Sequence, residues 1–187
     1  MSGLRRALLL VAIEGLVVGL VALAITLSSD HVDAVVANGV IGVFIGWSFI
    51  GVGLYAWWRR PENRFGLLMT AVGFAWFLAA LVSANAPWLF TLGVLVCNVY
   101  AAVFVHMLLA YPDGRVEEPR LRVVLGMAYA ISILGPAPAL LFRDTAALDP
   151  DFPDSVIQIT DDETLYRIFD GLTSAIAVAL VGYVLYV

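Results

Sequence analysis

The chain has 187 residues and a formal net charge of −5, and 62% of its residues are hydrophobic whereas only 13% are charged. Soluble domains carry about 25% charged residues, so this composition excludes an ordinary cytosolic protein and indicates a lipid bilayer as the solvent. The acidic balance and the absence of lysine also argue against nucleic-acid binding.

Six apolar runs follow one another along the chain, and each is long enough for a helix that crosses a bilayer, which takes about 20 residues. The strands of a membrane barrel would alternate polar and apolar residues, and these runs do not. We therefore expect an all-α integral membrane protein, a bundle of six transmembrane helices at residues 4–27, 35–58, 65–84, 88–111, 121–142 and 168–187.

The two ends of the chain add to this prediction. The first run follows Arg5 and Arg6 as in a signal peptide, but it exceeds the roughly 7–15 apolar residues of such a segment and contains Glu14. These features favour a retained helix. The sixth run stops at Val187 without a basic flank, so the sequence looks cut from a longer protein, in which a cytoplasmic module would follow directly.

The arginines predict the orientation, because short loops rich in arginine stay in the cytoplasm. Eight of the ten arginines lie before the first span or in the connections after the second and fourth spans, which fall on one side of the membrane. We expect this side to be cytoplasmic, with both termini inside. The inner loops would then be anchored by Arg59, Arg60, Arg64, Arg115, Arg120 and Arg122.

Prolines and glycines mark the expected breaks. Pro61 should end the second helix, because proline cannot continue the helical hydrogen bonds. The Pro-Asp-Gly sequence at 112–114 predicts a tight turn, since proline presets one dihedral angle and glycine permits positive φ. Gly135, Pro136 and Pro138 predict a kinked or unwound outer half of the fifth span.

The outer loop at 143–166 is the only long connection. Thr160 and Glu163 fit a capping box, which predicts that the last helix starts near Asp161. A group of acids in this loop suggests calcium, but Pro153 stands at the third ligand position and the turn glycine is missing. A solvated acidic loop is therefore favoured over a calcium loop for Asp149, Asp151 and Asp154.

Small and aromatic residues in the spans have two interpretations each. The pairs Gly15/Gly19 and Gly42/Gly46 match the small-residue motif of membrane helix contacts, and contacts within the bundle are favoured over a dimer seam. A group of aromatic residues could line a lipophilic pocket, although helix packing or lipid contact is favoured: Phe44, Trp47, Phe49, Phe74, Trp76 and Phe77.

Polar side chains at membrane depth are the candidates for function, because they normally face the protein interior. Asn98 and His106 are eight residues apart, so at roughly 100° per residue they share one side of the fourth span. Glu14 falls between them in depth. We expect the first and fourth helices to touch, with Glu14 turned inward, and hypothesise a ligand- or proton-sensing site at Glu14, Asn98 and His106; purely structural hydrogen bonding is the alternative.

These residues contain no recognisable motif of an enzyme active site. His31 and His106 lack neighbouring metal ligands in the sequence, and no phosphate loop, zinc motif or nucleophile elbow is present. We therefore assign no catalytic residue, no metal site and no cofactor to this chain.

Two stretches carry a family resemblance: RRPENRFGLLMTAVGFAWFLAAL at 59–81 and VHMLLAYPDGRVEEPRLRVV at 105–124. Together they resemble the N-terminal multi-helix membrane region of a bacterial sensor histidine kinase class. An Arg-Pro-x-Asn-x-x-Gly hairpin and a Leu-x-x-Pro-x-Gly-Arg loop after the fourth helix recur in that class. The resemblance covers roughly residues 57–125, and the rest of the chain is similar only in hydropathy.

The resemblance implies a homodimeric receptor in the bacterial plasma membrane. Its cytoplasmic kinase would use ATP and Mg²⁺ to phosphorylate its own histidine and would pass the phosphoryl group to a response regulator. That C-terminal kinase module is absent from these residues, and the intramembrane His106 is not its phosphoacceptor. The alternatives are a small transporter or solute-binding membrane protein, and a structural membrane subunit.

Overall fold

The computed structural model describes residues 2–145 and 151–186, and this part of the chain is helical without strands. Six of its helical segments are long and apolar enough to cross a membrane: Gly3–Leu27, Val35–Arg59, Phe65–Ser83, Pro87–Leu109, Pro119–Phe142 and Glu163–Tyr186. These six segments suggest a multi-pass membrane protein. Five of them match the predicted spans closely, and the last begins five residues earlier than residue 168, inside the expected outer loop.

Three segments are single helices: α1 (Ser2–Leu27), α2 (Val35–Arg59) and α9 (Glu163–Tyr186). The other three are interrupted. The third segment passes from α3 (Phe65–Leu78) into the 3-10 helix η1 (Ala79–Ser83), the fourth divides into α4 (Pro87–Val96) and α5 (Val99–Leu109), and the fifth divides into α6 (Pro119–Leu134) and α7 (Ala137–Phe142).

The predicted break in the fifth span is confirmed at Gly135 and Pro136. Gly135 N still donates to Ile131 O at 2.8 Å, and α7 starts one residue after Pro136. Pro138 lies in the first turn of α7, where a backbone N–H has no helical partner to lose. The break between α4 and α5, at Cys97 and Asn98, was not predicted, because neither glycine nor proline marks it.

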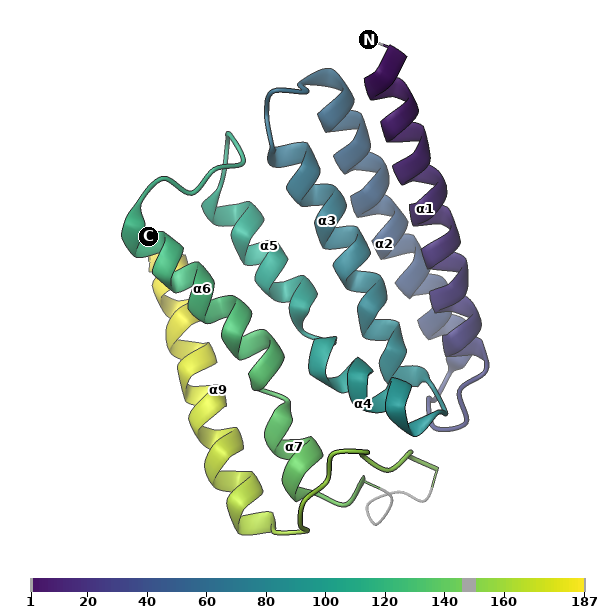
Figure 1. Ribbon diagram of the computed structural model, residues 1–187, viewed down its shortest axis with the longest axis vertical. Helices are drawn as coiled ribbons and strands as arrows, with labels where there is room; N and C mark the ends of the chain where they lie inside the picture. The colour runs from purple at the N-terminus through teal and green to yellow at the C-terminus, as the bar shows by residue number, and fades with distance from the viewer. Residues whose placement is uncertain (1, 146–150, 187) are drawn as a thin grey trace.

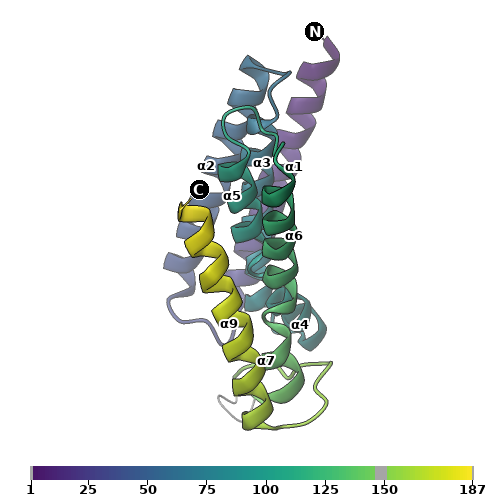
Figure 2. The ribbon, with the colours of Figure 1, turned by 90° about the vertical axis from the view of Figure 1, so that its left-hand side faces the viewer.

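The helices form a bundle in which α2 packs between α1 and α3, α5 packs on α3, α6 packs on α5, and α9 packs on α6 and α7 (Figures 1 and 2). The start of α1, the α2–α3 loop and the α5–α6 loop lie at one end, the top in Figure 1, and α9 runs back toward it. The connections that follow α1, η1 and α7 lie at the opposite end. The eight arginines of the predicted inner side therefore gather at one end of the bundle.

The best-buried part of the bundle lies between α1, α2 and α3. Phe77 is 4% exposed and its ring fills the space beside Gly46, where a Cβ atom would lie only 2.3 Å from the ring. Trp47 Nε1 donates to Gly15 O at 3.0 Å, which ties α2 to α1. The glycines and aromatics singled out from the sequence are thus used for contacts within the chain at these positions, as favoured, while Phe44 is exposed on the surface.

Helix α9 differs from the other five long apolar segments, because none of its described residues is buried. Its closest neighbours are α7 at the outer-loop end of the bundle and α6 farther along. This helix completes one side of a cavity.

Candidate functional site

The predicted cluster of Glu14, Asn98 and His106 does not form. Glu14 is exposed on α1, whose neighbours are α2, α3 and η1, so the expected contact of Glu14 with the fourth span is wrong. The reason is the orientation of α1, whose buried stripe contains Gly15 and Gly19. Gly15 is the residue directly after Glu14. At about 100° per residue, Glu14 is turned out of that stripe.

His106 and Asn98 have separate surroundings on α5 and at its start. His106 Nδ1 lies 3.2 Å from the Tyr129 hydroxyl of α6, and the two rings meet edge to face. This contact joins α5 to α6 and gives His106 a structural partner. Asn98 is exposed at the α4–α5 break. The three residues therefore do not lie together, and the structure does not support one sensing site made from all of them.

A cavity of about 460 Å³ lies between α5, α6 and α9, and we call it the α9 cavity. Pockets that hold small molecules typically measure about 300–1,000 Å³ and combine apolar walls with a few polar groups. The polar groups here come from the α4–α5 break, the end of α6 and the first half of α9: Cys97, Asn98, Ser132, Asp170, Thr173 and Ser174.

The polar side chains of the α9 cavity differ in whether they are already satisfied. Ser132 Oγ donates to Tyr129 O at 2.9 Å, and Thr173 Oγ1 donates to Asp170 O at 3.0 Å. Among the described residues, by contrast, neither the Asp170 carboxylate nor the Asn98 side-chain amide has a hydrogen-bond or ion-pair partner. These two side chains therefore remain available to a ligand.

Asp170 was not predicted as a site residue, although the sequence contains a signal that could have indicated it. It is the only charged residue inside the predicted span at 168–187. Acids at membrane depth are rare and usually functional, so its position alone could have singled it out. No group of three or more His, Cys, Asp or Glu side chains within residues 2–145 and 151–186 is placed to hold a metal ion.

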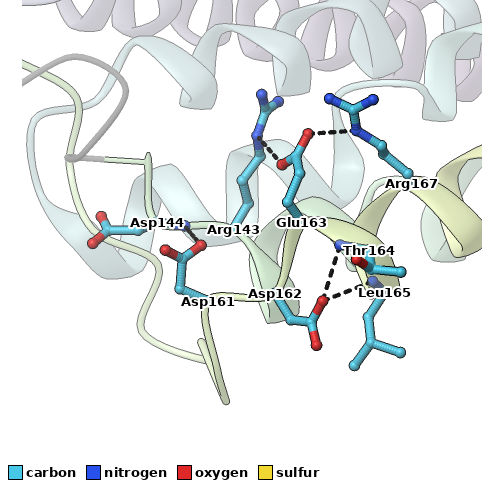
Figure 3. A network of polar contacts seen from close by, with 8 residues as sticks. All are labelled: Arg143, Asp144, Asp161, Asp162, Glu163, Thr164, Leu165 and Arg167. Carbon is cyan, nitrogen blue, oxygen red and sulfur yellow. Dashed lines mark hydrogen bonds and ion pairs between the residues drawn. The ribbon is translucent and has the colours of Figure 1, made fainter.

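The end of α7 and the start of α9, which flank the predicted outer loop, are joined by a polar network (Figure 3). Glu163 accepts a hydrogen bond from Arg167 Nε at 2.8 Å and forms a longer ion pair with Arg143 at 3.7 Å. The Arg143 guanidinium also lies 4.6 Å from the centre of the Tyr166 ring. Since Arg143 follows α7 directly, these contacts hold the start of α9 against the end of α7.

The start of α9 corrects the predicted cap. Asp162 Oδ1 accepts hydrogen bonds from Thr164 N at 2.9 Å and Leu165 N at 3.1 Å, so Asp162 is the N-cap residue (Figure 3). Thr160 instead uses its backbone N–H to contact Leu141 O at 3.3 Å. The capping box at Thr160 is therefore wrong by two residues, because an aspartate nearer to the helix provides the same acceptor.

The outer loop folds back onto the bundle between the described residues 151 and 162. Val156 N donates to Thr91 Oγ1 of α4 at 3.0 Å, and Ile159 N donates to Leu141 O of α7 at 2.9 Å. The Phe152 ring lies 4.8 Å from the His31 ring of the α1–α2 loop. Asp149, one of the acids weighed for calcium, lies outside the described residues.

The two motif stretches meet at the opposite end of the bundle. Asn63 Nδ2 donates to Pro112 O at 3.0 Å, while Asn63 Oδ1 accepts from Phe65 N at 2.7 Å, at the start of α3. Arg64 N donates to Asp113 O at 3.2 Å. The α2–α3 and α5–α6 loops are thereby joined into one unit, which we call the loop junction (residues 60–64 and 110–115).

Gly114 completes the loop junction and confirms the predicted turn. Its φ angle is +74°, and a Cβ atom at this position would lie 2.4 Å from the Arg64 carbonyl carbon and from Phe65 N. A side chain is thus excluded by both conformation and space. All six predicted anchor arginines are exposed around this junction: Arg59, Arg60, Arg64, Arg115, Arg120 and Arg122.

Comparison with known proteins yields no match: no family model fits the chain, and no curated protein or solved structure is significantly similar to it. The geometry of the α9 cavity and of the loop junction is therefore the basis for a functional proposal.

Proposed function

We propose that the chain is the membrane-embedded input region of a bacterial sensor histidine kinase, with both termini in the cytoplasm. The observation that carries this proposal is the attachment of α9. Its outer end is fixed to α7 by the Arg143–Glu163–Arg167 network, whereas none of its described residues is buried. A helix held at one end and loosely packed along its length can change its tilt when something binds beside it.

The remaining helices would provide the fixed frame for such a movement. The loop junction holds α3 and α5 together through Asn63, and Trp47 ties α2 to α1. A signal at the outer loop or in the α9 cavity would shift α9 against this frame. The movement would reach a cytoplasmic kinase beyond Val187, which would use ATP and Mg²⁺ and act on a response regulator, in a homodimer as the family resemblance implies.

The orientation is supported by the gathering of eight arginines at the end of the bundle that holds the loop junction. Single cysteines in a Cys97→Ser background, treated in whole cells with a membrane-impermeant maleimide, test it. Glu62→Cys and Glu117→Cys should react only after the cells are opened, whereas Asp33→Cys and Asp154→Cys should react at once. Labelling of Glu62→Cys in intact cells would overturn the proposed orientation.

The kinase function is tested on the full product of the gene. The reading frame should continue past Val187 into a dimerisation helix and an ATP-binding domain. That product, in vesicles with labelled ATP and Mg²⁺, should acquire an acid-labile, base-stable phosphate on a histidine other than His31 and His106. A stop codon directly after Val187 would overturn the kinase proposal.

A solute-binding or transport function is the second candidate, and the α9 cavity favours it. Its volume and its partly polar wall are what a bound small molecule requires. The gene sequence distinguishes the two proposals. A kinase domain after Val187 supports the first, and a chain that binds its solute without any such domain supports the second.

A further inference from the structure

The α9 cavity is elongated along the helices. Its lining residues on α9 run from Asp170 to Val184, which are 14 residues apart and therefore span about 21 Å at 1.5 Å per residue. From α6 to its C-cap they run from Val124 to Gly135, or about 16 Å. A groove of this length fits a linear molecule that lies parallel to the helices.

The two ends of the α9 cavity differ in polarity. The end nearer the outer loop holds Asp170 and Asn98 together with the hydroxyl groups of Ser132 and Ser174. The opposite end, nearer the loop junction, is lined by aliphatic side chains: Val105, Val124, Leu180, Val181 and Val184. An occupant that matches both ends is amphiphilic, with its polar group toward the outer loop.

The charge at the polar end of the cavity indicates which charge the polar group of the occupant should carry. Among the residues that the structure describes, Asp170 is the only acid that lines the cavity, and no arginine or histidine lines it. The nearest basic residue along α9, Arg167, is hydrogen-bonded to Glu163. Asp170 lies seven residues beyond Glu163, about 10 Å along the helix, so in a bilayer its carboxylate would be removed from bulk water and would need a partner.

We propose that the α9 cavity binds a single-chain amphiphile with a cationic headgroup. Its ammonium group donates hydrogen bonds to the Asp170 carboxylate and to the Asn98 side-chain oxygen. Its hydrocarbon chain lies along the aliphatic end, beside Val105 and Val181. This inference rests on the membrane insertion proposed above but not on the kinase, and it is tested on the chain alone.

The experiment measures the binding of labelled dodecylamine, which is protonated at neutral pH as a lysine side chain is. The purified chain is placed in nanodiscs of zwitterionic lipid, and partition into empty nanodiscs is subtracted. Dodecanol and dodecanoate, with the same chain length, report the neutral and the anionic headgroup. We expect saturable binding of dodecylamine, weaker binding of dodecanol and the weakest binding of dodecanoate.

Asp170→Asn removes the charge and keeps the shape. It should weaken dodecylamine binding about 10- to 100-fold, the range of a hydrogen bond to a charged group, and leave dodecanol binding unchanged. Asp154→Asn is the matched control, because Asp154 is an exposed acid of the outer loop and does not line the cavity. It should leave all three affinities unchanged.

Ala177→Trp tests the position of the site, since Ala177 lines the cavity from α9 without being buried. The large side chain should reduce binding of dodecylamine and dodecanol alike in a protein that retains its helical circular dichroism. Absence of saturable dodecylamine binding to the folded wild-type chain would overturn the proposal. Equal losses of dodecylamine and dodecanol binding in Asp170→Asn would also overturn it. An Ala177→Trp protein that keeps its affinity for dodecylamine but no longer dimerises would do the same, because a second copy of the chain would then occupy the groove.

Discussion

Helices α3 and α9 have almost the same apolar character and opposite environments. The mean hydropathy of their most apolar 18-residue windows is 2.1 for the α3–η1 segment and 1.9 for α9. A third of the first window is buried in the bundle, whereas no residue of the second is. Hydropathy therefore does not decide which of these helices joins the tightly packed part of the bundle.

The two helices also differ in the placement of small residues. On α3, Gly66 lets the backbone touch α2 so closely that a Cβ atom would lie 2.4 Å from Trp57 N. On α9, a Cβ atom at Gly171 or Gly182 would meet no described atom within 4 Å beyond its chain neighbours and its own helix backbone. Close backbone approach is what holds membrane helices together where no hydrophobic effect acts between them. Neither glycine of α9 makes such an approach, which fits the movement proposed for this helix.

The largest expected effect comes from the same substitution in both helices. Gly66→Ala places a methyl group against the α2 backbone, which cannot move aside, so we expect a loss of about 3 kcal/mol in the free energy of unfolding. Gly171→Ala meets open space and should gain about 0.5–1 kcal/mol, because alanine loses less conformational freedom in a helix. Unfolding by sodium dodecyl sulfate in mixed micelles measures both; equal effects would remove the difference between the two helices.

The loop junction supplies the next effect. Asn63→Ala deletes the bonds to Pro112 O and Phe65 N and should cost about 2 kcal/mol, at about 1 kcal/mol per hydrogen bond. Asn63→Asp keeps the acceptor for Phe65 N and loses the donor, so about half of that cost should remain. The same micelle titration gives both values, and an Asn63→Asp protein as unstable as Asn63→Ala would show that the hydrogen bond from Phe65 N to Asn63 Oδ1 does not contribute.

The start of α9 should respond locally rather than globally. Asp162→Ala removes the N-cap and should cost about 1 kcal/mol, felt as faster hydrogen exchange at the amides of Thr164 and Leu165. Thr160→Ala leaves both bonds intact and should leave this exchange unchanged. Faster exchange in Thr160→Ala than in Asp162→Ala would restore the capping box predicted from the sequence.

The smallest effect is expected at Glu14. Like Asp170, it is an acid within a predicted span, but it is exposed on α1 and does not line the α9 cavity. Glu14→Gln should leave dodecylamine affinity unchanged and change stability by less than about 0.5 kcal/mol, as at other surface positions. A loss of affinity as large as that of Asp170→Asn would place the site elsewhere.

Much of the fold could be predicted from the sequence, because its signals are local. The length of each apolar run sets the span, Gly135 and Pro136 interrupt the helix wherever they stand, and Gly114 takes a positive φ that the turn demands. The predicted arginine side also matches one end of the bundle, although its location in the cytoplasm remains a proposal.

The candidate site could not be predicted in the same way, because it depends on which face of each helix finds a neighbour. A change of one position, from Glu14 to Gly15, separates the exposed face of α1 from its buried stripe. The break at Asn98 has no local signal that distinguishes it from a polar residue inside a continuous helix. Asp170 had a local signal, but its meaning depends on the cavity that residues of α5, α6 and α9 line together.

The central claim, that α9 moves against a fixed frame, is tested most directly by distances between spin labels at the loop-junction end of the bundle. Leu67 on α3, Leu108 on α5 and Leu185 on α9 are exposed and suit labelling in a Cys97→Ser chain in nanodiscs. Double electron–electron resonance should give a narrow distance distribution for Leu67–Leu108 and a clearly broader one for Leu108–Leu185. A Leu108–Leu185 distance distribution as narrow as that of Leu67–Leu108 would contradict the claim.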